Sequence, residues 1–184
     1  MTISCSHRRR PAEAVAILVL ILAIAPAGCR RQKRITVQTT EETPVLATMV
    51  ATADPNAAKQ LAGGFYGVEQ NSWRWTAGRF SVLLHPPRMA ARNGATLQLK
   101  FAIPAVAFPR MKGVSLSAYV NGTALSPQTY TQPGSFVYSR DVPAIFLAGD
   151  VVRVDFSVDK TIPPTPSDKR ELGLVVSMVG FLAK

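Results

Sequence analysis

One stretch carries the pattern on which the fold assignment rests: Val114-Ser115-Leu116-Ser117-Ala118-Tyr119-Val120-Asn121-Gly122-Thr123-Ala124-Leu125. Apolar and polar residues alternate up to Val120, which is the period of a β-strand with one buried face. The pair Asn121-Gly122 that follows is the strongest short-range signal for a two-residue hairpin turn. The chain is therefore predicted to reverse here and to return as a second strand.

The same alternation recurs on both sides of this hairpin, and its apolar positions are predicted to face a core. These positions are Phe80, Val82 and Leu84; Leu97, Leu99 and Phe101; and Val152, Val154, Phe156 and Val158. The final run, residues 172–182, is apolar at most positions and is expected to lie centrally in a sheet.

Together these runs predict an all-β protein of seven to eight strands, folded as an antiparallel, jelly-roll-like β-sandwich over residues 54–184. One short helix is predicted at the start of this domain. Asp54 is its expected N-cap, Pro55 occupies the first helical position, and the Gly63-Gly64 pair is expected to end it.

The N-terminal residues predict an export signal. A basic segment, residues 7–10, precedes an uninterrupted apolar run from Ala14 to Ala25. As a helix this run would span about 18 Å, which is too short for a hydrocarbon core of about 30 Å but suits a signal peptide. Residues 1–28 are therefore predicted to be a signal peptide, and residues 29–53 a tether.

Two cleavage patterns overlap at the end of this segment. Ala25-Pro26-Ala27 fits the small-x-small pattern of ordinary signal peptidase sites. Ala27-Gly28-Cys29 resembles the bacterial lipobox, whose cysteine is acylated, although Pro26 stands where a lipobox usually carries leucine. Lipidation of Cys29 is the favoured prediction, giving a membrane-anchored protein that faces the periplasm or the cell surface. Simple secretion in soluble form is the alternative.

Charge and cysteine content exclude several classes of function. The chain has a net charge of +10, but seven of its 21 Lys and Arg residues flank the apolar segment, and the remainder are scattered. A nucleic-acid-binding domain would show a basic stripe on its folded part, so no nucleic-acid partner is expected. Both cysteines, Cys5 and Cys29, precede the predicted domain, which therefore has neither a disulfide nor a thiolate metal site.

Two motifs stand near the ends of the predicted domain. They are Gly64-Phe65-Tyr66-Gly67-Val68-Glu69-Gln70-Asn71-Ser72-Trp73-Arg74-Trp75-Thr76 and Ser167-Asp168-Lys169-Arg170-Glu171-Leu172-Gly173-Leu174. In this order they resemble the opening and closing segments of a β-sandwich accessory domain of bacterial polysaccharide and glycosyltransferase-associated proteins. The resemblance covers about residues 55–184. It implies a domain that accompanies enzymes and is not itself a transferase.

The two tryptophans of the first motif have two interpretations. Trp73 and Trp75 are two residues apart on a predicted strand, so their rings share a face. If they are exposed, they form a platform for the apolar face of a sugar ring, with Tyr66 as a further candidate ligand-binding residue. If they are buried, they are the largest side chains of the core.

The charged residues of both motifs predict an ion-pair clamp between the first and last strands. The clamp residues are Glu69, Arg74, Asp168, Arg170 and Glu171. Alternatively, Asp168, Arg170 and Glu171 bind sugar hydroxyls, or the carboxylates bind Ca²⁺ through their oxygens.

Catalytic motifs are missing from the sequence. His85 is the only histidine after the signal segment, and no nucleophile elbow, P-loop or dinucleotide-binding motif is present. No catalytic residue, metal or cofactor is therefore predicted. The predicted function is a non-catalytic module that binds carbohydrate or another component of the cell envelope. A structural or protein-interaction domain is the alternative, and a small two-carboxylate glycan hydrolase is third.

Overall fold

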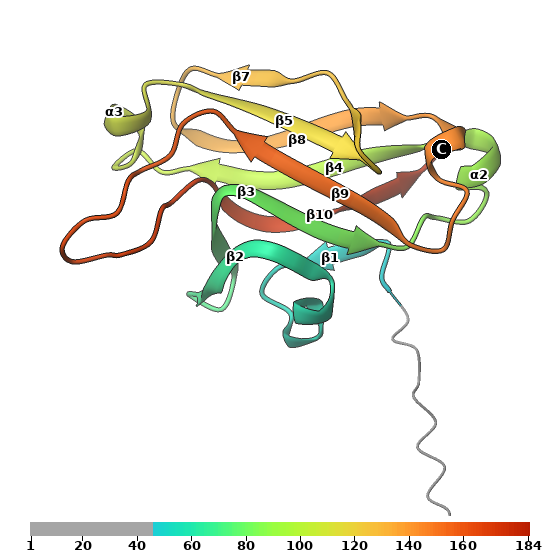
Figure 1. Ribbon diagram of the computed structural model, residues 1–184, viewed down its shortest axis with the longest axis horizontal. Coiled ribbons are helices and arrows are strands. Elements are labelled where there is room, and N and C mark those ends of the chain that lie inside the picture. The colour runs from blue at the N-terminus through green and yellow to red at the C-terminus, as the bar shows by residue number, and fades with distance from the viewer. Residues whose placement is uncertain (1–45) are drawn as a thin grey trace, which may run out of the picture. The chain divides into compact units, whose positions relative to one another are not determined.

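Antiparallel strands dominate the computed structural model, which describes residues 46–184 (Figure 1). The predicted signal peptide, Cys29 and the tether up to residue 45 lie outside the described residues. In the described part of the chain, no helix has both the length and the apolar composition to span a membrane.

Residues 46–184 contain ten strands and four short helical elements. The strands are β1 (Met49–Ala51), β2 (Leu61–Glu69), β3 (Trp73–Leu84), β4 (Ala95–Ile103), β5 (Val114–Val120), β6 (Thr123–Ala124), β7 (Gln128–Tyr130), β8 (Gly134–Val142), β9 (Val152–Val158) and β10 (Val175–Ala183). The helical elements are η1 (Pro55–Lys59), α2 (Ala90–Asn93), α3 (Phe108–Met111) and η2 (Ala144–Phe146).

One curled sheet forms both layers of the fold. Its strand order is β6-β5-β9-β3-β10-β4-β8, with antiparallel pairing throughout. Strand β3 joins the layers because its two halves have different partners. Trp75 pairs with Val175 of β10, whereas residues 79–84 pair with β9. Figure 1 shows β9 crossing over β4 and β10. The predicted antiparallel β-sandwich is confirmed.

The inner faces of the two layers share one core. Nine of the ten apolar positions predicted to face inward are at most 3% exposed, and the tenth, Val158 at the end of β9, is half-buried. The rings of Phe80 and Phe156, on neighbouring strands, stack with their centroids 4.9 Å apart. Strand β10 lies centrally, as predicted, with β4 on one side and β1 and β3 on the other. Burial of these side chains supplies most of the driving force for folding.

The hairpin predicted at Asn121-Gly122 is also confirmed. Val120 of β5 pairs with Thr123 of β6. Asn121 and Gly122 have φ values of 48° and 84°, and two consecutive positive φ values are what a type I′ turn requires.

The predicted N-terminal helix is present as a single short turn. The side chain of Asp54 accepts a hydrogen bond of 2.8 Å from the backbone N–H of Asn56, and Pro55 begins the helix. The helix ends at Lys59 and not at the glycine pair, because β2 begins at Leu61 and pairs with β3.

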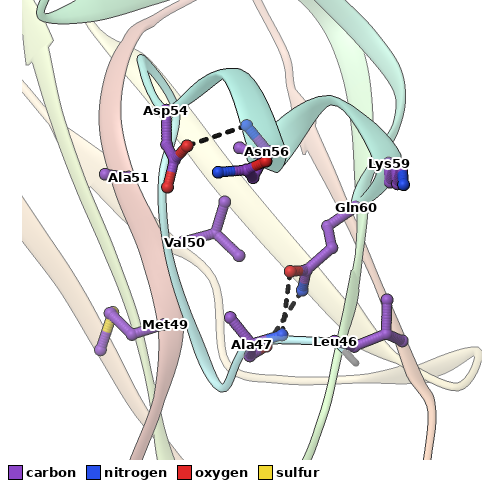
Figure 2. Close-up of a pocket in the computed structure, with 10 residues that line it drawn as sticks. Leu46, Ala47, Met49, Val50, Ala51, Asp54, Asn56, Lys59 and Gln60 are labelled. Carbon is purple, nitrogen blue, oxygen red and sulfur yellow. Dashed lines mark hydrogen bonds between the residues drawn. The ribbon is translucent and has the colours of Figure 1, made fainter. Parts of the chain in front are cut away.

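The segment before this helix is held against the sheet. Residues 49–51, part of the predicted tether, form β1 and pair with β10. The amide of Gln60 accepts from the N–H of Ala47 at 2.9 Å and donates to the carbonyls of Ala47 and Leu83 at 3.0 and 2.8 Å. Figure 2 shows this contact beside the pocket between β1 and η1. The folded part of the chain therefore includes residues before position 54.

The strand number of ten in residues 46–184 exceeds the prediction because of short or irregular strands. Strands β1, β6 and β7 have only two or three residues each, too few to show a period. Strand β2 contains three glycines, and its register against β3 shifts three times, so its sequence does not alternate.

Candidate functional site

The two tryptophans lie at the start of β3, on the outer surface of the sheet. Trp75 pairs with Val175, which in turn pairs with Ala102 of β4. Both tryptophans are half-buried, so they are neither sealed in the core nor fully exposed. Their rings meet edge to face, with centroids 6.2 Å apart and an interplanar angle of 88°. This is a preferred arrangement of two aromatic rings and fixes both indoles.

Each tryptophan borders a shallow hollow. Trp73 lines one of about 410 Å³ over β4, β8 and β10. Trp75 lines a second, of about 270 Å³, beside α3 and the loop between β9 and β10. We call Trp73, Trp75 and these two hollows the tryptophan face.

The walls of both hollows combine apolar and hydrogen-bonding side chains. The first is lined by Trp73, Lys100, Phe101, Ala102, Ser135, Phe136, Val137, Val175 and Ser177. The second is lined by Trp75, Val106, Ala107, Arg110, Ile162, Pro163, Thr165, Asp168, Arg170 and Leu172. Such a mixture suits a ligand that has an apolar face and a polar edge.

Tyr66 lies beside the tryptophan face and not in it. Its hydroxyl donates a 2.8 Å hydrogen bond to the carbonyl of Glu171, and the guanidinium of Arg170 lies 5.4 Å from its ring centroid. Tyr66 lines neither hollow. The ring therefore contacts the charged residues of the second motif.

The structure brings together three of the five residues predicted for the ion-pair clamp. Arg170 makes two parallel contacts with Asp168, Nε to Oδ1 at 3.0 Å and Nη2 to Oδ2 at 2.8 Å. Its Nη1 donates to Oε1 of Glu69 at 2.8 Å. We call these three residues the Arg170 cluster. Because Glu69 ends β2, the cluster ties that strand to the loop before β10.

The other two clamp residues have different partners. Arg74 donates to the backbone carbonyls of Thr52 at 2.7 Å and Tyr66 at 2.8 Å. Glu171 accepts a 2.7 Å hydrogen bond from the hydroxyl of Thr161. Within residues 46–184 neither of them forms an ion pair. Arg74 instead connects Thr52, which follows β1, to Tyr66 of β2.

A calcium site at the second motif finds no geometric support in the described part of the chain. There, no three His, Cys, Asp or Glu residues gather closely enough to hold a metal ion. Both carboxylates of the Arg170 cluster are occupied by the guanidinium. Its hydrogen bonds lower the pKa of Asp168 from 3.8 to about 2.

We expect the Arg170 cluster to make stability depend on pH. Replacing Arg170 by glutamine should lower the melting temperature by a few degrees at neutral pH, and the difference should shrink below about pH 4. A carboxyl whose pKa is lowered by folding stabilises the protein above its unfolded pKa. That contribution is lost as the pH falls through the folded pKa, here about 2. Thermal unfolding followed by circular dichroism at several pH values measures the difference.

Lys169→Gln is the matched control, because it removes an exposed neighbouring charge that has no ion-pair partner in residues 46–184. A melting difference between wild type and Arg170→Gln that stays constant from neutral pH to pH ~2 would contradict a role for the pairing with Asp168.

Several residues of the tryptophan face carry no sequence signal. Lys100, Ser135, Ser177 and Arg110 come from three strands and α3, far apart in the sequence. The alternation of residues 96–101 places Lys100 on an outward-facing position, but it does not show that Lys100, Ser135 and Ser177 gather beside a tryptophan. Only the register of β4 against β8 and β10 brings them there.

Comparison with known proteins gives similarity of fold only. No protein-family model and no curated protein matches the sequence. Among solved structures, the CBM36-1 domain of a multidomain xylanase from the hindgut metagenome of Trinervitermes trinervoides is 10% identical, with a TM-score of 0.43, over 74% of this chain and 97% of that one. The carbohydrate-binding module CBM36 in complex with calcium and xylotriose is 12% identical, with a TM-score of 0.40, over 73% and 98%.

The acetyl xylan esterase Est2A from the rumen bacterium Butyrivibrio proteoclasticus is 11% identical, with a TM-score of 0.44, over 76% of this chain and 34% of that one. At such identities and TM-scores the likeness is one of general strand arrangement, and no ligand or site residue follows from it. The chain is thus an all-β, antiparallel sandwich whose structural neighbours include carbohydrate-binding modules.

Proposed function

We propose that this protein is an exported, lipid-anchored and non-catalytic module that binds carbohydrate through the tryptophan face. One observation carries the proposal: the only two tryptophans of the chain are half-buried side by side, with a hollow next to each. A small domain gains stability by burying aromatic rings completely. Both rings instead remain partly exposed, which favours a role in binding.

The chemistry of the two hollows matches a saccharide. A pyranose ring presents C–H groups on its faces and hydroxyls around its edge. The indole rings offer apolar surface for the former. The hydroxyls of Ser135 and Ser177 and the cationic groups of Lys100 and Arg110 offer hydrogen bonds for the latter. Apolar surface with a few convergent polar groups is the general composition of a small-molecule site.

Asp168, the one carboxylate within residues 46–184 that lines the tryptophan face, is a poor candidate for the general acid of a glycosidase. A glycosidase needs one carboxyl that stays protonated near neutral pH to act as the acid. Asp168 has its pKa lowered to about 2 by its hydrogen bonds with Arg170, which is the wrong direction for that role. Glu69 binds the same guanidinium.

A second candidate function is a protein-interaction domain of the envelope without glycan binding. In residues 46–184, β8 is the last strand in the sheet order, and its Val137 is 48% exposed. Val106, beside Trp75, is 88% exposed. An unpaired strand edge and exposed apolar side chains are features that partner proteins use. An association of this domain with glycosyltransferases would be one form of this protein-interaction function.

Glycan-array binding separates these two functions. Purified residues 30–184, applied to an array of bacterial envelope and plant cell-wall polysaccharides, should bind at least one class of glycan. The same preparation with both tryptophans replaced by phenylalanine is the matched control, and should bind the same glycan more weakly. If wild-type protein binds no polysaccharide, the module interpretation fails, and the interaction domain becomes the better account.

Export and lipid anchoring are proposed from the sequence of the first 29 residues. In a bacterial host, the mature protein should begin at an acylated Cys29 and sediment with membranes. Cys29→Ser should move it to the soluble fraction, whereas Cys5→Ser, the matched control within the predicted signal peptide, should leave it with the membranes. Mass spectrometry of the mature N-terminus checks this result. A mature protein that begins at an unmodified Gly28 would show simple secretion instead.

A further inference from the structure

A second groove lies at the other end of β3, on the outer surface of the β3, β9 and β5 layer. It has a volume of about 480 Å³ and uses none of the residues of the tryptophan face. It is lined by Arg79, Ser81, Tyr119, Arg153, Asp155, Phe156 and Ser157. We call it the arginine groove.

The register of the three strands explains its shape. Asp155 of β9 pairs with Tyr119 of β5 on one side and with Ser81 of β3 on the other. In the next row, Ser157 pairs with Ser117 and Arg79. Ser81 and Ser157 are therefore the short outward-facing residues that line the groove, among the longer side chains of Arg79, Tyr119, Arg153 and Asp155.

One carboxylate in the arginine groove is already neutralised. Asp155 accepts a 2.6 Å hydrogen bond from the hydroxyl of Ser81 and two from Nε of Arg153, at 2.9 and 3.1 Å. Arg153 also donates through Nη2 to Ser81 at 3.0 Å. Burial raises the pKa of Asp155, but the bonds from Arg153 and Ser81 outweigh it and hold this pKa below its ordinary value. Asp155 and Arg153 are therefore both ionised at neutral pH, and their opposite charges cancel.

Arg79 leaves the arginine groove with one excess positive charge. Its side chain is exposed and makes no ion pair or side-chain hydrogen bond with any residue that the structure describes. A guanidinium presents a planar fork of donors that matches a carboxylate. Tyr119, half-buried on the opposite side of the groove, adds an aromatic ring and a hydroxyl.

We propose that the arginine groove is a second, independent site, which binds an acidic saccharide. A sugar carboxylate pairs with Arg79, the ring lies against Tyr119, and the hydroxyl of Ser157 binds a sugar hydroxyl. A neutral sugar would leave the guanidinium of Arg79 without an anionic partner and would therefore bind more weakly. This site does not depend on the tryptophan face, and either can exist without the other.

The test is an amide chemical-shift titration of residues 30–184 with trigalacturonate, and with cellotriose as the neutral control. Trigalacturonate should shift the amide resonances of Ser81, Asp155 and Ser157, and the shifts should saturate. Its dissociation constant should be at least about tenfold lower than that of cellotriose. Arg79→Gln should weaken this binding roughly tenfold or more, because it removes a charge-assisted pair. Arg92→Gln, an exposed arginine in α2, should change nothing.

Three results would overturn the proposal: equal responses to both trisaccharides, an Arg79→Gln variant that binds normally, or the same shifts caused by inorganic phosphate alone. The double variant Trp73→Ala/Trp75→Ala keeps this test separate from the first proposal. Trigalacturonate should still bind the arginine groove of that variant, even where binding at the tryptophan face is lost.

Discussion

Replacing Gly64 by alanine will lower the free energy of unfolding by about 3 kcal/mol or more, the largest effect expected of any single methyl group in this domain. Gly64 has a φ of +76°, a conformation that residues with a Cβ rarely adopt. An added Cβ would also collide with the carbonyl oxygen of Arg79 and lie 2.6 Å from Cα of Phe80. These are backbone atoms of β3 and cannot move aside without disturbing its pairing.

Gly63→Ala is the matched control, since an added Cβ at that neighbouring position meets no atom within 4 Å. Chemical unfolding followed by circular dichroism should show a large loss for Gly64→Ala and little change for Gly63→Ala. Equal losses for the two variants would contradict the close approach of β2 to β3 at Gly64. This close approach also matters for the candidate site, because β2 carries Tyr66 and Glu69 to the Arg170 cluster, beside the tryptophan face.

Replacing both tryptophans by alanine will weaken glycan binding roughly 100-fold or more, the second of the two large effects. Trp73 and Trp75 provide the only indole surface of the chain, and each borders one hollow. Large aromatic side chains at the centre of a binding surface typically carry most of its affinity. Native affinity electrophoresis in gels that contain the bound polysaccharide measures the change.

Trp75 packs partly against the core, so the alanine variant will also lose stability. The phenylalanine double variant separates the two effects, because it keeps aromatic rings of smaller area in both places. It should melt close to the wild type and bind with intermediate affinity. If the alanine variant is folded and binds as tightly as the wild type, the tryptophan face is not the binding site.

The strands that were predicted correctly are those whose sequence has a strong local period. Residues 96–101 and 152–157 alternate strictly, and their apolar positions are buried. Residues 79–84 alternate except at Leu83, which is only half-buried. The turn at Asn121-Gly122 was predictable for a similar reason, since its conformation depends on two adjacent residues. Strand β2 was not predictable, because glycines and register shifts remove the alternation.

The candidate site was predicted only in part, because its shape depends on contacts between distant segments. The spacing of Trp73 and Trp75 predicts a shared face, and their rings do meet. Whether that face is exposed depends on β8, β10 and the loop before β10, which no local pattern of β3 reveals. Arg74 shows the same limit. Its charge suggested a carboxylate partner, but its position places backbone carbonyls within reach.

The arginine groove shows why outward-facing positions are harder to interpret than inward-facing ones. Ser81, Asp155 and Ser157 satisfy the polar half of an alternating pattern, which any solvent-exposed strand would do. Their grouping around Arg79 follows from the order β5-β9-β3, in which the central strand is the last of the three in the sequence. That order is a property of the fold and is not visible in any one strand.

Intrinsic fluorescence tests the central claim most directly, because both tryptophans of the chain belong to the proposed carbohydrate site. Titrating residues 30–184 with the polysaccharide that it binds best should change the intensity or wavelength of tryptophan emission. The change should saturate, and its midpoint should equal the dissociation constant measured by calorimetry. Saturable binding in the calorimeter with no change in tryptophan emission would contradict the claim that the sugar stacks on Trp73 and Trp75.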